Sequence, residues 1–92
     1  MSGQRAWHVE FDRSAAGDLR KLRHEGQRRV LTYLRKRIAA VEDPRRFGRP
    51  LTGDLKGLWR YRVGDYRIIA TIEEQRFVVL VVSVGHRREV YR

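Results

Sequence analysis

The dipeptide Gly64-Asp65, which stands between two segments of alternating side chains, constrains the fold more than any other feature of the sequence. A two-residue loop of this kind joins the strands of a β-hairpin and fixes their register. In that register Arg62 lies directly opposite Arg67. Arg60 and Ile69 lie beside them on the same face. The residues that point the other way are mostly apolar: Trp59, Tyr61, Val63, Tyr66, Ile68 and Ala70. The hairpin is therefore expected to have one basic face and one face that belongs to the core.

Two arginines directly opposite each other normally destabilise a sheet, because like charges repel across the strands. The pair formed by Arg62 and Arg67 is therefore best explained by an anion that binds between the two guanidinium groups. Arg60 and Arg87, which follows the last strand, could bring the number of converging guanidinium groups to four. Such groups can bind a phosphate in bidentate fashion and stabilise charge that develops during a reaction. We expect an RNA phosphate; the alternative is an acidic partner protein that covers the charged face without any chemistry.

The N-terminal part of the sequence predicts a strand followed by a helix. Three apolar residues alternate with polar ones, as in a half-buried strand: Trp7, Val9 and Phe11. Asp12 or Ser14 can cap a short helix that runs to about Arg23, and Gly26 is predicted to stop it.

A second helix is predicted from about Gln27 to Val41, and Asp43-Pro44 is expected to end it. Its apolar stripe has helical spacing and consists of Val30, Leu34, Ile38 and Val41, widened by Leu31. Residues 43–57 contain two prolines and three glycines and are predicted to form a loop. Three strands follow, at about residues 58–63, 66–73 and 76–84, with Glu74-Gln75 as the turn between the last two.

This order of elements, β-α-α-β-β-β, predicts a single α+β domain over residues 1–92. We expect a small antiparallel sheet, with a mixed sheet as the alternative. The N-terminal helical hairpin is expected to pack on one face of the sheet, because each helix has one apolar stripe and the strands have one apolar face. The other face of the sheet is then left open.

The composition favours an anionic partner and gives no sign of a metal site. The net charge of +10 arises from 21 basic and 11 acidic residues, which indicates nucleic acid, an acidic protein, or both. There is no cysteine, and the three histidines are scattered, so we expect no metal and no small-molecule cofactor. The longest apolar run, residues 77–82, is far shorter than the roughly 20 residues that span a bilayer. We therefore expect a cytoplasmic protein with no membrane partner.

Two stretches of the sequence resemble a known family. Residues 51–69, LTGDLKGLWRYRVGDYRII, and residues 82–91, VSVGHRREVY, are strongly similar to the RelE toxins of the RelE/ParE superfamily. The resemblance implies the toxin of a bacterial type II toxin–antitoxin module that cuts messenger RNA in the ribosomal A site. It also implies three partners, which are a cognate antitoxin protein, the ribosome and mRNA. The N-terminal half fits the family through its pattern of elements.

The resemblance also implies roles for individual residues. Arg67 matches the arginine that contacts the scissile phosphate, and Arg87 matches the one that stabilises the transition state and the leaving group. Tyr91 matches the tyrosine that positions the substrate nucleotide. Arg60 stands where the family often has a lysine proposed to help activate the attacking hydroxyl, and nearby Lys56 is a second candidate for that role.

This sequence departs from the family pattern in the groups that could move a proton. Arginine stays protonated at ordinary pH, so Arg60 can stabilise an alkoxide but is a poor base. His86 stands where several relatives have lysine, and histidine changes its charge near neutral pH, so it is predicted to act as acid or base. Lys56, Arg62 and Arg88 are expected to bind RNA. The expected reaction is attack of a ribose 2′-hydroxyl on the adjacent phosphate, without a metal, giving a 2′,3′-cyclic phosphate and a 5′-hydroxyl.

Two other functions are compatible with the sequence. A ParE-type toxin would inhibit DNA gyrase on the same scaffold without cleaving RNA. A catalytically silent member would only bind its antitoxin.

Overall fold

The hairpin around Gly64-Asp65 is present in the computed structural model, which describes residues 7–86. Strands β3 (Trp59–Val63) and β4 (Tyr66–Glu73) pair antiparallel, with Arg62 opposite Arg67. Gly64 has a φ of 59°, a conformation that glycine adopts without steric cost. The register predicted from the two-residue loop is therefore confirmed.

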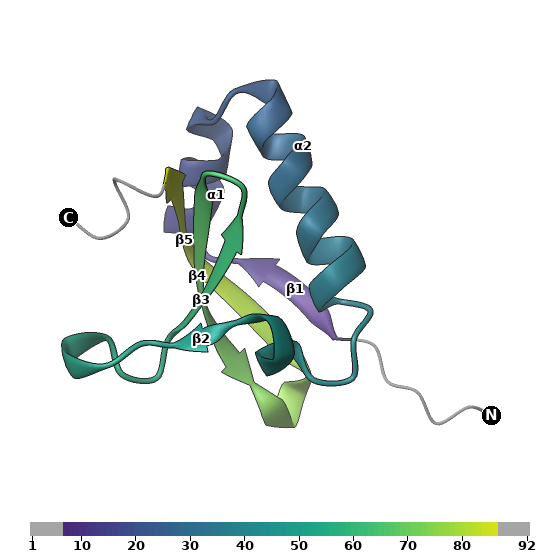
Figure 1. Cartoon of the computed structure of the whole chain (residues 1–92), viewed down its shortest axis with the longest axis vertical. Coiled ribbons are helices and arrows are strands. Elements are labelled where there is room, and N and C mark those ends of the chain that lie inside the picture. Colours follow the sequence, from purple (N-terminus) through teal and green to yellow (C-terminus); the bar gives the residue numbers. More distant parts are fainter. Residues whose placement is uncertain (1–6, 87–92) are drawn as a thin grey trace.

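Within residues 7–86 the strands form one five-stranded sheet in the order β1-β5-β4-β3-β2 (Figure 1). The outer members are β1 (His8–Phe11), β5 (Val78–His86) and the short strand β2 (Arg49–Pro50). Strand β1 pairs parallel with β5 and the other neighbours pair antiparallel, so the sheet is mixed. The predicted α+β class and the order β-α-α-β-β-β are confirmed, and β2 is an additional strand in the segment that was predicted to be a loop.

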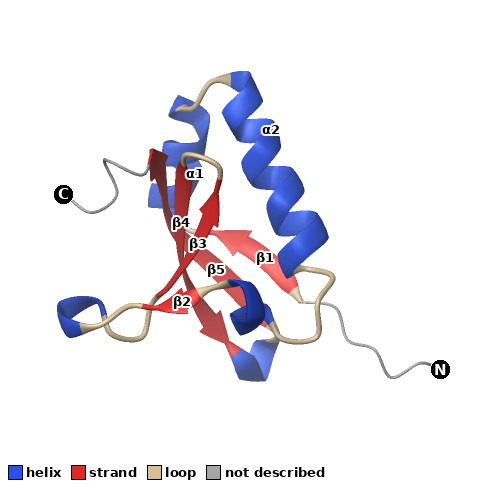
Figure 2. Ribbon diagram, in the orientation of Figure 1, coloured by secondary structure: helices blue, strands red, loops and turns tan. Residues whose placement is uncertain are grey.

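Helices α1 (Arg13–Lys21) and α2 (His24–Tyr33) form the expected hairpin beside the sheet (Figure 2). Both contribute to the same cluster of buried side chains. Its members from the helices are Ala15, Val30, Leu34 and Ile38, and its members from β3, β4 and β5 are Tyr61, Ile68, Ala70, Val79, Val81 and Val84. Val30, Leu34 and Ile38 of the predicted stripe thus meet the apolar face of the hairpin in one core, whereas Leu31 is exposed and Val41 lies beyond the helix. This arrangement leaves the arginines on the opposite face.

A β-bulge changes which residues of β5 face the core. Ser83 is paired with Ile69 and Val81 with Ala70, so Val82 between them has no partner in β4. Before the bulge the core residues are odd-numbered, and after it Val84 lies opposite the core residue Ile68. Every residue from Ser83 to the end of β5 therefore faces the side opposite to the one that simple alternation would give.

Two side chains of the first helix fix its position. The Asp12 Oδ1 atom accepts a hydrogen bond of 2.8 Å from the Ala15 backbone N–H, so Asp12, and not Ser14, is the cap. The Asp18 Oδ2 atom accepts one of 3.0 Å from the backbone N–H of Val84, on the part of β5 that extends beyond β1. This contact holds the last part of β5 against α1.

The prediction that Gly26 stops a helix is wrong, because Gly26 lies in the first turn of α2 and is buried. A Cβ atom at this position would lie 2.7 Å from the Tyr66 hydroxyl oxygen and 2.9 Å from its Cζ atom. The chain instead leaves α1 at Leu22, whose carbonyl oxygen accepts a 3.0 Å hydrogen bond from Gln27 Nε2. Glycine is required here by the close approach of a tyrosine ring.

The second helix ends earlier than predicted. After Tyr33 it continues as a π-helical segment, Leu34–Ile38, in which the Ala39 N–H donates to the Leu34 carbonyl at 2.8 Å. Asp43-Pro44 does not end this helix but begins a 3₁₀ turn, Pro44–Phe47. The four-residue spacing of the apolar stripe does not distinguish an α-turn from a π-turn.

The connection between β4 and β5 is longer than the predicted Glu74-Gln75 turn. A 3₁₀ turn, Glu74–Arg76, is followed by Phe77 in the left-handed conformation with φ of 55°. The Phe77 ring lies edge-on to Trp7, with the ring centroids 5.1 Å apart. Strand β5 therefore starts two residues later than predicted, at Val78.

Tyr61 fastens the segment before β2 to the sheet. Its side chain is fully buried, and its hydroxyl donates a 2.8 Å hydrogen bond to the Pro44 carbonyl oxygen. A Cβ atom on Gly48 would lie 2.8 Å from the Tyr61 Cε1 atom, so the chain passes directly over the ring. Burial raises the pKa of Tyr61 above its usual value.

No helix within residues 7–86 has the length and apolar character needed to cross a membrane.

We predict opposite effects for two glycine-to-alanine changes in neighbouring helices. Gly26→Ala should lower the free energy of unfolding by about 1–3 kcal/mol, because the methyl group overlaps Tyr66. Gly17→Ala is the control, since only the end of Arg20 comes as close as 4.0 Å, and it should raise stability by about 0.5–1 kcal/mol. Urea denaturation measures both values. A stabilised Gly26→Ala variant would contradict the assigned contact.

We also predict that stability falls at alkaline pH because of Tyr61. Its pKa is raised in the folded state, so its contribution is complete below the unfolded pKa of about 10 and is lost as pH rises above that value. Tyr61→Phe should cost about 1 kcal/mol at neutral pH, through the lost hydrogen bond to Pro44, but should flatten the alkaline decline. Denaturation at pH 7 to 11 tests this, with Tyr33→Phe, at a less buried tyrosine, for comparison. An equally steep decline in Tyr61→Phe would show that other groups cause it.

Candidate nucleic-acid interface

Four arginines lie together on the face of the sheet opposite the helices. Arg49 of β2 is paired with Arg60 of β3, and Arg62 of β3 is paired with Arg67 of β4. Directly opposite residues have Cβ atoms about 4.5–5.5 Å apart, and the two pairs are separated by about 6.6 Å along β3. We call Arg49, Arg60, Arg62 and Arg67 the arginine face.

Three members of the arginine face lack acidic partners in the part of the chain that the structure describes. Within residues 7–86, the side chains of Arg49, Arg60 and Arg62 form no salt bridge and no hydrogen bond. Other arginines do find carboxylates: Arg45 bridges Asp43 at 3.0 Å and Glu74 at 2.8 Å. The arginine face is therefore arranged to receive an anion that the described part of the chain does not supply.

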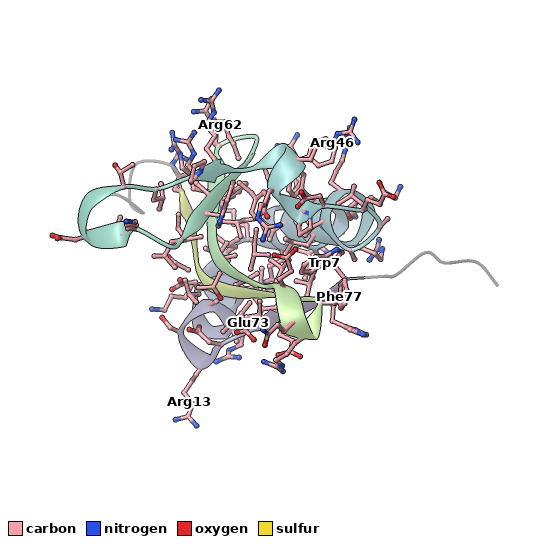
Figure 3. All side chains as sticks on the ribbon, turned by 90° about the horizontal axis from the view of Figure 1, so that it is seen from below. Trp7, Arg13, Arg46, Arg62, Glu73 and Phe77 are labelled. Atoms are coloured by element: carbon pink, nitrogen blue, oxygen red, sulfur yellow. The ribbon has the colours of Figure 1, made fainter. Side chains whose placement is uncertain are left out.

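A cavity of about 400 Å³ opens at the β2 side of this face. It is lined by Phe47, Arg49, Arg60 and Arg62. Figure 3 shows Arg62 projecting away from the body of the protein. The cavity thus presents three cations and one aromatic ring to solvent.

Arg67 is half-buried, as Arg60 is, whereas Arg49 and Arg62 are exposed. It lies between Arg62 on β3 and Gly85 on β5, and its Nε atom is buried. Gly85 has no side chain and is itself buried. Ile69 lies on the same face, two residues after Arg67 on β4, and is a buried apolar residue with only 6% exposure. A rigid, partly enclosed guanidinium group is suited to binding one phosphate in a defined orientation.

His86 lies on the other face of the sheet. It is paired with Tyr66, and the two rings form an edge-to-face contact with centroids 6.0 Å apart. The bulge at Val82 causes this placement, because it sends Gly85 to the arginine face and His86 to the helix side. The structure therefore does not bring His86 beside Arg62 and Arg67.

Of the remaining predicted site residues, the structure describes only Lys56, which does not lie on the arginine face. Lys56 is exposed at the end of a 3₁₀ turn, Gly53–Leu55, in a loop that extends away from the sheet (Figure 1). Arg87, Arg88 and Tyr91 lie outside the described residues, and their assignments stay predictions.

Comparisons with known proteins identify the family. The sequence profile described as "ParE toxin of type II toxin-antitoxin system, parDE" matches residues 9–91. The chain belongs to the RelE/ParE toxin superfamily. Toxin RelE of Mycobacterium tuberculosis is 30% identical over 92 residues, covering 100% of this toxin and 93% of that protein. Toxin RelG of the same organism is 31% identical over 84 residues, covering 91% and 94%.

Solved structures agree with this assignment. The toxin–antitoxin complex RelBE2 of M. tuberculosis superposes with a TM-score of 0.84 at 27% identity, covering 97% of this toxin and 100% of that chain. An archaeal RelE–RelB complex from Pyrococcus horikoshii gives a TM-score of 0.68 at 26% identity, covering 92% and 99%. The chain is therefore a type II toxin with a RelE-like structure, and the expected class of partner is a cognate antitoxin.

Two residues of the toxin's candidate site, Arg49 and Phe47, are not evident from the sequence pattern. Strand β2 has only two residues, so it shows no alternation, and Pro50 argues against a strand at this point. The available signal was the sequence Arg49-Pro50 at the end of the loop, since proline is tolerated on an edge strand.

Among the residues described, no group of three or more His, Asp or Glu side chains is arranged to hold a metal ion.

Proposed function

We propose that this toxin is a ribosome-dependent endoribonuclease of the cytoplasm that cleaves mRNA in the A site. The observation that carries the proposal is the arginine face, in which two directly opposed arginine pairs lie on rigid strands. The RelE resemblance of residues 51–69 and the full-length similarity to Toxin RelE support the same activity. An acidic segment of the antitoxin would complement the charge of +10.

In the proposed reaction the ribose 2′-oxygen attacks the adjacent phosphorus atom. A bond forms between these two atoms, and the bond from phosphorus to the 5′-oxygen breaks. The 2′-hydroxyl loses a proton and the departing 5′-oxygen gains one, which leaves a 2′,3′-cyclic phosphate and a 5′-hydroxyl. Arg67 binds the phosphate oxygens, and Arg60 and Arg62 stabilise negative charge on the entering oxygen and the phosphoryl group.

The other proposed roles follow from the resemblance. Arg87 stabilises the leaving group, Tyr91 positions the nucleotide, and Arg88 and Lys56 bind the RNA backbone. The ribosome orients the mRNA, which can lower the barrier by about 7 kcal/mol or more. This contribution is consistent with a protein that offers few groups able to accept a proton.

The proton-transfer role of His86 is the part of the proposal that the geometry supports least. His86 packs against Tyr66 on the helix side, whereas Arg67 lies on the opposite face. We therefore propose that His86 acts mainly by holding the end of β5, from which Arg87 follows in sequence.

Inhibition of DNA gyrase is the second candidate, because the matching family profile is named for ParE. A gyrase inhibitor does not require arginines without internal acidic partners on a rigid sheet. The similarity to RelE toxins over the whole chain favours the nuclease.

We predict that Arg67→Ala reduces the cleavage rate on programmed ribosomes by about 100- to 1,000-fold, because one phosphate contact is lost. Arg13→Ala is the matched control, since Arg13 is exposed on α1 (Figure 3) and should leave the rate unchanged. Mapping of mRNA 5′ ends against ribosome position measures cleavage. Full toxicity in Arg67→Ala, or a DNA-damage response to the wild type without A-site cleavage, would contradict the nuclease.

We predict that His86→Gln lowers activity by less than tenfold and keeps the pH dependence of the cleavage rate. The amide retains a polar group beside Tyr66 but cannot relay a proton, so the pH–rate profile separates the two roles. Loss of one limb of the profile in His86→Gln would assign proton transfer to this residue.

A further inference from the structure

We propose that the cavity beside β2 binds the nucleotide next to the one that is cleaved. In this subsite Arg49 and Arg60 bind the backbone phosphate, Arg62 is shared with the cleavage site, and Phe47 stacks on the base. The proposal rests on the proposed nuclease function and adds a second recognition position to it.

Phe47 is an exposed aromatic residue that is held in place. The residue is 38% exposed and lines the cavity beside three arginines. The Arg37 guanidinium carbon lies 5.5 Å from the ring centroid. Phe47 borders the cavity, whereas Arg37 does not line it. One part of the ring thus remains available for a planar ligand.

The backbone that carries Phe47 is fixed at both ends. Asp43 caps the 3₁₀ turn by accepting a 3.0 Å hydrogen bond from the Arg45 backbone N–H, and this bond lowers the pKa of the Asp43 carboxyl. Tyr61 holds the Pro44 carbonyl at 2.8 Å, and the chain then passes over the Tyr61 ring at Gly48. Because the ring is already positioned, little conformational entropy is lost when a base stacks on it.

The chemistry of the lining fits a nucleotide better than an acidic peptide. Three guanidinium groups that have no acidic partner within residues 7–86 supply the phosphate contacts, and the residues of that range that line the cavity include no carboxylate. An aromatic ring contributes little to binding a carboxylate, whereas stacking on a base contributes strongly to single-strand RNA recognition. The volume of about 400 Å³ is within the range of about 300–1,000 Å³ usual for small-ligand sites.

The subsite is adjacent to the proposed cleavage site because Arg62 belongs to both. Arg62 lines the cavity and also lies directly opposite Arg67. A phosphate in the cavity and a phosphate at Arg67 are therefore neighbours on one RNA strand. Since any base has a flat face, this subsite should respond to the presence of a base and only weakly to its identity.

The test is a set of binding measurements with short single-stranded RNAs that contain 2′-deoxy residues and so cannot be cleaved. One oligonucleotide has all its bases, and the others each lack the base at one position. Binding to the full-length toxin is followed by fluorescence anisotropy. The variants are Phe47→Leu, which keeps apolar volume, and Arg49→Gln, with Arg46→Gln as the matched control because Arg46 is exposed but does not line the cavity.

We expect loss of the base at one position to weaken wild-type binding by about fivefold or more. In Phe47→Leu the same oligonucleotide should bind no more weakly than the intact one. Arg49→Gln should weaken binding of every oligonucleotide and reduce its salt dependence, whereas Arg46→Gln should change affinity by less than twofold. Circular dichroism of each variant verifies the fold.

The proposed subsite is contradicted if base removal weakens binding equally in the wild type and in Phe47→Leu at every position. It is also contradicted if Arg49→Gln and Arg46→Gln change RNA affinity to the same extent. It is also overturned if a polyglutamate peptide loses affinity in Phe47→Leu while RNA does not, which would make the cavity a protein-docking site. If base removal weakens binding only when Phe47 is present, but the toxin does not cleave mRNA on ribosomes, the nuclease function is contradicted and the subsite is supported. If Phe47→Leu cleaves mRNA at the wild-type rate and responds to base removal as the wild type does, the subsite is contradicted and the nuclease function is not.

Discussion

The pairing of β3 with β4 is the constraint on which the rest of the structure depends. Because side chains alternate along a strand, a shift of one residue would move Arg62 into the core and Tyr61 to the surface. The two-residue loop at Gly64 prevents that shift, and the burial of Tyr61 and Ile68 opposes it as well. One local turn thus decides both the contents of the core and the composition of the charged face.

The repulsion between Arg62 and Arg67 lies on strands whose opposite face is buried. Arg62 and Arg67 oppose each other on strands whose other face lies in the middle of the apolar core. Burial of several aliphatic and aromatic side chains offsets a repulsion that would cost an isolated hairpin a large part of its stability. Acidic residues that could neutralise the charge are used elsewhere, as in the pairs that Arg45 and Arg76 make with Glu74 and Glu73.

The sequence predicted the features that depend on periodicity and failed for those that depend on tertiary contacts. The hairpin register follows from local spacing and is confirmed, and the helical stripe is confirmed at Val30, Leu34 and Ile38 but not at Leu31 and Val41. Gly26 was misread because its neighbour, Tyr66, is 40 positions away in the sequence. Strand β2 is too short to show alternation, so Arg49 and the cavity beside it were missed. The roles of Arg87, Arg88 and Tyr91 rest on the resemblance alone.

The bulge at Val82 has a consequence for how such a site can change. Val82 has no partner in β4, so its deletion would leave Gly85 opposite Arg67 and His86 opposite Tyr66. A deletion of one residue after the bulge, at Val84, would keep Ser83 opposite Ile69 but bring His86 opposite Arg67 on the charged surface. A single-codon deletion at that point is therefore a direct evolutionary route from a site built mainly of fixed cations to one with a titratable group.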